Sequence, residues 1–190
     1  MNEPNNSENK LVLGILAAHV CTDEKERIDV AAITRFALSE VHIFGKTNVR
    51  GHITGSALIV DHQGRTLLTF HRKLQRWLQL GGHSNPDETN PAQTAMREAR
   101  EESGLTDLVF DSTFGATPFD IDVHTIPARK AEAEHLHLDF RYLLRTEMPE
   151  QIICSDESDV LRWVPLIELD EYDFDPALKR AIDKIRFVNS

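Results

Sequence analysis

Three glutamates and an arginine lie close enough in the sequence to act together. Glu101 and Glu102 follow Glu98 by three and four residues, so on a helix their carboxylates fall on one face. Such a cluster repels itself unless a cation neutralises it, and Mg²⁺ and Mn²⁺ prefer oxygen ligands. Arg97, four residues before Glu101, can offset part of the charge. An acidic cluster by itself is more often a solvated helix face, so the neighbouring residues have to decide.

The neighbouring residues extend the cluster into a longer pattern. Residues 97–105 read REAREESGL, and Gly82 and Glu88 stand upstream. This stretch resembles the Nudix box, which is R-E-U-x-E-E-x-G-U (U is apolar) preceded by G-x5-E. In one departure, eight residues instead of seven separate Glu88 from Arg97. The extra residue falls near Asn90, before the helix, so it leaves the glutamate spacing intact and affects only the match of Glu88.

The resemblance implies an α/β fold, the Nudix-type α/β/α sandwich with a mixed β-sheet. It also implies that Glu101 and Glu102 are the main ligands of Mg²⁺ or Mn²⁺, helped by the backbone carbonyl of Gly81. Glu98 is either a further ligand or the general base, and Arg97 orients the carboxylates. In some relatives the base comes from a later loop, which makes Glu157 in the segment SDESD an alternative, although a solvated acidic turn is the favoured interpretation of that segment.

The implied reaction is hydrolysis of a phosphoanhydride bond. The expected substrate is a nucleoside diphosphate linked to another moiety, or a related small diphosphate. Bound cations would neutralise the phosphate oxygens and activate water. Two alternatives use the same fold: a sensor that binds a nucleotide without cleaving it, and an isomerase of isopentenyl diphosphate. A sensor usually lacks the box glutamates, and the isomerase needs a suitably placed cysteine, whereas Cys21 and Cys154 are far from the box.

A predicted hairpin after the box carries polar residues on alternate positions. Its strands span residues 119–126 and 135–144, and a period of two places the polar side chains on one shared face. The face is either solvated or part of a substrate cleft, in which Arg141 holds a phosphate and the histidines contact a base or sugar. The candidate substrate-binding residues, here and near the glycine pair, are Arg72, His83, His124, His135, His137 and Arg141. A separate metal site on the hairpin is conceivable, and Trp77 and His52 are left undecided.

Local patterns predict the elements that position these residues. We expect a helix over 10–20, a second helix capped by Thr22, strands over 52–60, 66–70 and 76–80, a helix over 91–103, a strand over 161–164 and a last helix after Asp175. Residues 1–45 form a predicted N-terminal helical extension, and residues 46–190 form the predicted Nudix domain.

The composition limits the classes of partner. A net charge of −10 over 190 residues disfavours binding to a nucleic acid polymer, and 41% hydrophobic residues are enough for a packed core. Two isolated cysteines indicate a reducing, cytoplasmic setting. Residues 11–20 are too short and too poorly flanked for a convincing signal peptide, and we expect no membrane association. A homodimer formed through the N-terminal helices is a further hypothesis.

Overall fold

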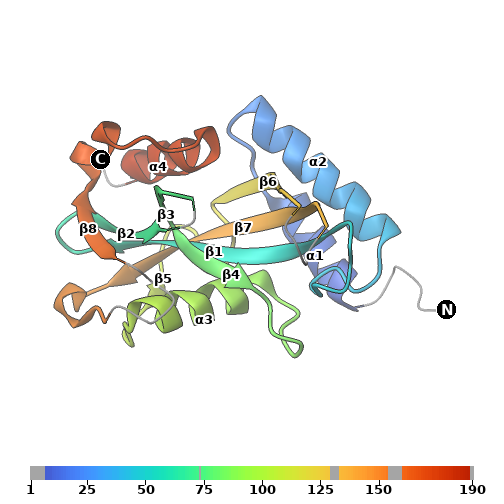
Figure 1. Ribbon diagram of the computed structural model, residues 1–190, viewed down its shortest axis with the longest axis horizontal. Coiled ribbons are helices and arrows are strands. Elements are labelled where there is room, and N and C mark those ends of the chain that lie inside the picture. The colour runs from blue at the N-terminus through green and yellow to red at the C-terminus, as the bar shows by residue number, and fades with distance from the viewer. Residues whose placement is uncertain (1–6, 73, 129–132, 154–159, 189–190) are drawn as a thin grey trace.

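A curled β-sheet runs through the middle of the molecule, with α3 on one side, α4 on the other, and α1 and α2 at one end (Figure 1). The structure, a computed structural model, describes residues 7–72, 74–128, 133–153 and 160–188. The helices are α1 (Ser7–Ala18), α2 (Glu24–Ser39), α3 (Pro91–Ser103) and α4 (Pro176–Val188), with 3₁₀ turns at Pro149–Gln151 and Leu166–Glu171. The strands are β1 (Gly51–Asp61), β2 (Arg65–His71), β3 (Arg76–Leu78), β4 (Leu80–His83), β5 (Val109–Phe110), β6 (Asp120–Ile126), β7 (His135–Thr146) and β8 (Leu161–Pro165).

The long strands β1 and β7 form the centre of the sheet. They pair in parallel, with Gly51 opposite Leu136 and Asp61 opposite Thr146. The other pairings are antiparallel: β4 and β2 join β1, β6 and β5 join β7, and β3 and β8 join β2. The mixed sheet between helices that the resemblance implied is therefore confirmed.

The bounds of α3 agree with the predicted helix over 91–103, and local signals explain them. The Asn90 side chain accepts a hydrogen bond from the Ala92 backbone N–H at 3.0 Å, and Gly104 ends the helix with a left-handed φ of 73°. The helix lies very close to β1, because a Cβ atom on Gly55 would be only 2.4 Å from the carbonyl oxygen of Pro91. The small side chains that α3 turns toward the sheet permit this approach and leave the glutamates on its other faces.

Several other predicted bounds need correction. The strand over 76–80 is two strands, since β3 pairs with β2 whereas β4 crosses to β1. Strand β5 and both 3₁₀ turns were not predicted. The second helix is capped by Asp23, whose carboxylate accepts from the Glu26 N–H, and not by Thr22. The predicted hairpin is confirmed as the antiparallel pair β6–β7, and Asp175 does cap α4.

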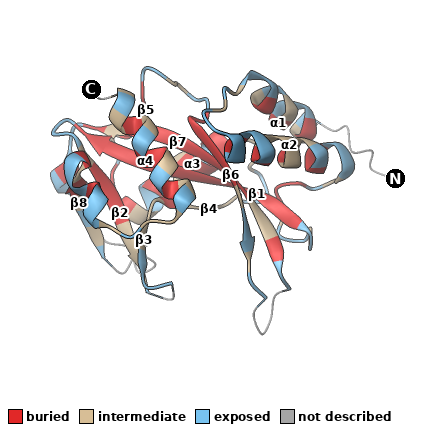
Figure 2. Cartoon of the chain, turned by 90° about the horizontal axis from the view of Figure 1, so that it is seen from above, coloured by how far each residue is buried: buried red, intermediate tan, exposed pale blue. Residues whose placement is uncertain are grey.

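Buried residues are concentrated in the strands and on the inward sides of the helices (Figure 2). One core lies between α3 and the sheet, and another lies between α4 and the opposite side of the sheet. Helices α1 and α2 supply Val12, Ile33 and Phe36 to a third core that they share with the sheet residues Ile53 and Phe140. The boundary at residues 45 and 46 and the homodimer stay predictions. No helix among the described residues is long and apolar enough to cross a membrane.

Candidate active site

Two of the three α3 glutamates border a cavity of about 1050 Å³. Glu98 and Glu102, one helical turn apart, line its wall together with Gly81 and Gly82 of β4. Glu101 is not part of this wall, and its side chain is 59% exposed. Among the described residues, the three glutamates do not form a group whose ligand atoms all lie within 4.8 Å of one another. The structure therefore brings Glu98 and Glu102 to the cavity and leaves Glu101 beside it.

The glycine pair is shaped to receive these carboxylates. A Cβ atom on Gly82 would lie 2.6 Å from Oε1 of Glu98, so a larger residue there would displace the Glu98 carboxylate from its present position. Gly81 has a φ of 150°, and its backbone N–H donates to Oε2 of Glu102 at 3.1 Å. The pairing of β4 with β1 holds both glycines in place, with Gly81 opposite Ser56.

Arg97 links the helix to the loop that precedes it. Its Nε and Nη2 donate to the Glu88 carboxylate at 2.8 and 3.0 Å, and Nη2 also donates to the His83 carbonyl oxygen at 2.7 Å. On the other side, Nη1 donates to Glu98 at 3.0 Å and to Glu101 at 2.7 Å. The extra residue before the helix is thus absorbed in the loop, and Glu88 still meets Arg97. The carboxylates around it raise the pKa of Arg97, led by its hydrogen bond to Glu88, so the guanidinium stays charged.

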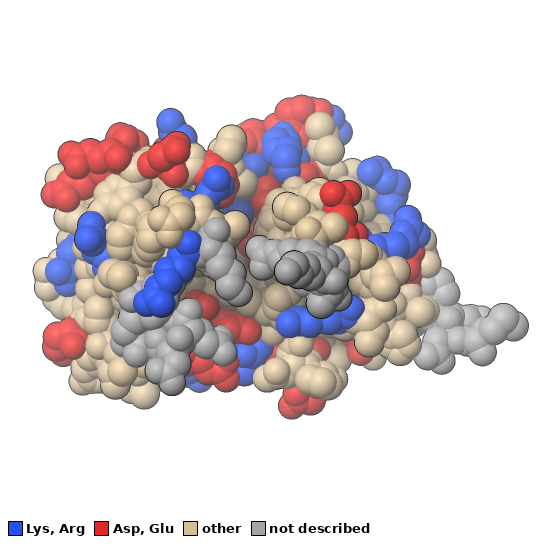
Figure 3. Space-filling view, viewed as in Figure 1, with Lys and Arg blue, Asp and Glu red and all other residues tan. Residues whose placement is uncertain are grey.

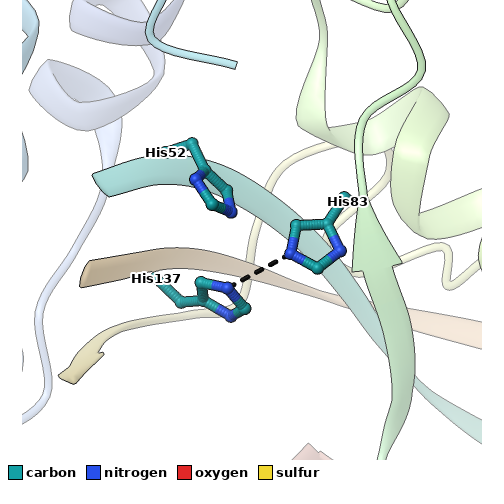
Figure 4. Close-up of side chains that lie close together, drawn as sticks. All are labelled: His52, His83 and His137. Atoms are coloured by element: carbon teal, nitrogen blue, oxygen red, sulfur yellow. Dashed lines mark hydrogen bonds between the residues drawn. The ribbon is translucent and has the colours of Figure 1, made fainter. Parts of the chain in front are cut away.

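All four predicted substrate-binding histidines line the same cavity, namely His83, His124, His135 and His137. His137 lies opposite His52 on β1 and opposite His124 on β6. His83 of β4 lies beside His52 and His137, as Figure 4 shows. Burial lowers the pKa of His83 to about 4 and that of His137 to about 2, and neighbouring positive charge adds to both shifts. These two rings are therefore neutral at physiological pH.

Arg141 does not reach the cavity, which corrects its expected role as a phosphate ligand. Its side chain is 3% exposed, and Nη1 donates to Asp120 at 2.7 Å. Asp122 and Asp139 lie 3.5 and 3.3 Å from its other guanidinium nitrogens. A guanidinium surrounded by three carboxylates in the protein interior is committed to structure, so it has no free edge for a substrate phosphate.

The remaining expectations for the site have mixed outcomes. Arg72 lies in the exposed turn between β2 and β3, where its neighbours His71 and Leu74 border the cavity and Arg72 does not. Trp77 packs against Phe70 in the core, so the base-stacking alternative receives no support. Glu157, the alternative base, lies outside the described residues.

Sequence reasoning missed the contribution of β1 to the cavity. Thr54 and Ser56 line it, and both hydroxyls donate to the Asp139 carboxylate, at 2.9 and 2.7 Å. The alternation in HITGS places these residues on one side of the strand together with His52. That alternation was the available signal, but only the parallel pairing of β1 with β7 brings them to the histidines.

Comparisons with known proteins agree with this geometry. A family model of the NUDIX domain matches residues 51–185. The chain is 31% identical over 133 residues to a probable DHNTP pyrophosphohydrolase of Lactococcus lactis subsp. cremoris (strain MG1363), and the match covers 69% of this chain and 76% of that protein.

Solved structures show the same fold. An Ap4A hydrolase of C. elegans has a TM-score of 0.57 and 17% identity, with 72% of this chain and 96% of that chain covered. A hydrolase of the NUDIX family from Clostridium perfringens has a TM-score of 0.53 and 26% identity, with 72% and 97% covered. The residues matched by the family model include α3, the glycine pair and the strands that line the cavity.

Proposed function

This chain belongs to the Nudix family of hydrolases that act on pyrophosphate bonds, and we propose that its substrate is a nucleotide-like small molecule bound in the cavity beside α3. The observation that carries the proposal is the placement of Glu98 and Glu102, side by side on the cavity wall and next to the glycine pair. The cavity has the size of a small-molecule site, and it combines carboxylates at one wall with neutral imidazoles at another.

Nudix enzymes generally use a divalent metal, and the residues here fit Mg²⁺ or Mn²⁺. The donors are carboxylate oxygens and the backbone oxygen of Gly81, which are the ligands such hard cations prefer. Because Gly82 has no side chain, it leaves space beside the Glu98 carboxylate that a Cβ atom would fill. Glu98 and Glu102 would hold the ion, and Glu101 would join them if its ion pair with Arg97 opened. When bound, the ion would neutralise the phosphate oxygens and lower the pKa of a coordinated water.

The protein's own residues have separate tasks in this proposal. Arg97 holds Glu98 in place from one side while Glu88 holds Arg97, so the Glu98 carboxylate is oriented before the substrate arrives. Glu98 is 15% exposed at the cavity wall, where a carboxylate can accept a proton from attacking water. Glu157 is the alternative proton acceptor.

The opposite wall is proposed to read the non-phosphate part of the substrate. Asp139 accepts hydrogen bonds from Thr54 and Ser56, and it faces the cavity beside His135 and His137. Carboxylate and imidazole groups suit the polar edge of a heterocyclic base or a sugar hydroxyl. The Lactococcus relative is named for a pterin triphosphate, so pterin and purine nucleotides are the first substrates to test.

The experiment is a hydrolysis screen with Mg²⁺ or Mn²⁺, in which the products are separated by chromatography, against dihydroneopterin triphosphate, nucleoside triphosphates, dinucleoside polyphosphates and nucleoside diphosphates linked to a sugar. We expect cleavage of at least one compound by the wild type and large losses in Glu98→Gln and Glu102→Gln. Glu168→Gln, which changes an exposed glutamate outside the cavity wall, is the matched control and should keep full turnover. Tight binding of one compound without any cleavage would overturn hydrolysis and favour the nucleotide sensor.

A further inference from the structure

Three histidines from three different strands point toward one another at the edge of the cavity (Figure 4). His52 comes from β1, His83 from β4 and His137 from β7, and one ligand nitrogen from each lies within 4.8 Å of the other two. The ring centres of the three pairs are all 4.9 Å apart. Convergence of this kind is the first requirement of a metal site, because each ligand must reach the same point.

The spacing of two of these nitrogens suits a metal ion between them. Nε2 of His83 and Nε2 of His137 are 3.2 Å apart. Two imidazole nitrogens bound tetrahedrally at about 2.0–2.1 Å from Zn²⁺ would be separated by roughly 3.3 Å. The ion could therefore replace the hydrogen bond between the rings with almost no movement of their backbones.

The strands hold these histidines in register. His52 lies directly opposite His137 in the parallel pair β1–β7, and Thr54, two residues along β1, lies opposite His83 in the antiparallel pair with β4. All three strands belong to the central part of the sheet, so the ligands stand on rigid elements and not on loops. Burial also lowers the pKa of His83 and His137, which keeps these two imidazoles in the neutral form that binds metal.

The chemistry of this group differs from that of the glutamate wall. Imidazole nitrogen suits Zn²⁺ and similar transition metals, whereas carboxylate and carbonyl oxygens suit Mg²⁺ and Mn²⁺. We propose that His52, His83 and His137 form a second metal site, which binds a nitrogen-preferring divalent ion such as Zn²⁺ independently of the glutamates. With three protein ligands, the ion could take a further ligand from the cavity, since His83 and His137 line it.

His124 and His135 complete the surroundings of the site without being needed as ligands. Their ring centres lie 5.4 and 5.3 Å from that of His137. Each has Nδ1 in contact with an oxygen, at 3.0 Å from Asp122 for His124 and at 2.9 Å from the Ala133 carbonyl for His135. These contacts hold both imidazole rings in place beside the three proposed ligands.

The test measures Zn²⁺ binding to the metal-stripped full-length chain by calorimetry, in excess Mg²⁺ so that oxygen sites are filled. We expect one Zn²⁺ per chain for the wild type and for Glu98→Gln and Glu102→Gln. His83→Asn and His137→Asn should each weaken binding at least about 100-fold, since changing a residue that merely orients a metal ligand already costs about 10- to 100-fold. His62→Asn, an exposed histidine at another place, is the control and should bind like the wild type.

A second measurement on the wild type avoids dependence on the folding of the variants. Imidazole nitrogen NMR signals should shift for His52, His83 and His137 on addition of one equivalent of Zn²⁺, while the signal of His62 stays in place. Absence of Zn²⁺ uptake by the wild type would overturn the proposal. Zn²⁺ uptake that survives the histidine changes but is lost in the glutamate variants would overturn it as well.

Discussion

The two ends of the hairpin β6–β7 carry the same alternation of polar and apolar side chains, yet they lie in opposite environments. At one end, Asp120 and Asp122 face Arg141, and all three are buried. At the other end, His124 faces His137, and both border the cavity. Figure 3 shows Lys and Arg side chains beside Asp and Glu side chains over the parts of the molecule that carry α2 and α4.

Helices α2 and α4 account for the difference. They bring basic side chains to the aspartates: Lys25 contacts Asp122 at 3.3 Å, while Arg180 and Lys184 each contact Asp120 at 2.8 Å. Because basic side chains pair with its aspartates, this end of the hairpin can be covered by the helices and shielded from solvent. The histidine end borders the cavity and stays open. A polar strand face therefore becomes part of the buried scaffold or part of a site according to which elements pack over it.

The largest effect is expected from removing the central charge of the closed end. Arg141→Met leaves three buried aspartates without their shared cation, and breaking a buried ion pair in this way costs about 3–5 kcal/mol of unfolding free energy. Urea unfolding measures the change. Arg76→Met, at an exposed arginine of β3, should stay within about 0.5 kcal/mol of the wild type. Equal stability of Arg141→Met and wild type would show that the network contributes nothing to the fold.

In the cavity that the open end borders, the expected effect is on activity and not on stability. Glu102→Gln removes a proposed metal ligand, so kcat/KM should fall by at least about 100-fold for any substrate that the wild type cleaves. The unfolding midpoint should stay the same or rise slightly, because the change removes one of two neighbouring like charges. Steady-state kinetics and urea unfolding on the same preparation separate the two outcomes. A variant that is as active as the wild type would refute the metal role.

Acid should weaken the closed end in a defined pH range. Burial alone would raise the pKa of Asp122, but the hydrogen bond to His124 and the positive charge of Arg141 outweigh it and lower the pKa. A carboxyl group with a lowered folded-state pKa stabilises the protein fully above its ordinary value, near 4, and loses that contribution as the pH falls below it. Urea midpoints between pH 6 and 3 should therefore fall less steeply in Asp122→Asn than in the wild type. Asp170→Asn, an exposed aspartate, should follow the wild-type curve.

The smallest effect is expected at Glu101, although it is adjacent to Glu102. Its carboxylate is exposed and held by Arg97, and an exposed ion pair contributes no more than about 1 kcal/mol, or roughly fivefold in a rate. Kinetics of Glu101→Gln beside Glu102→Gln measure the contrast between the two neighbours. A loss in Glu101→Gln as large as that in Glu102→Gln would mean that Glu101 leaves Arg97 and turns to the metal during the reaction.

Local signals accounted for much of the fold. The cap at Asn90, the first-turn proline and Gly104 set both ends of α3, and the alternation of polar and apolar residues set the strands of the hairpin. The predicted strand bounds were wrong where the choice of a partner strand decided them. Strand 76–80 is divided because β4 crosses to β1, and no property of its five residues reports that pairing.

The same distinction between local signals and long-range pairing applies to the candidate site. Helical spacing and the glycine pair were enough to bring Glu98 and Glu102 together, because residues one turn apart on a helix are neighbours wherever that helix packs. They could not show that Glu101 stays outside the cavity wall, or that the parallel register of β1 and β7 places His52 against His137.

By itself the sequence determined the family, the helix that carries the glutamates and the strand faces that carry the histidines, since these depend on spacings of a few residues. Only the tertiary structure decided which of those groups meet and which are covered, so that Arg141 became buried scaffold and His83 and His137 cavity wall. The physical reason is that periodicity is a local property of the chain, whereas burial and charge pairing depend on segments far apart in sequence.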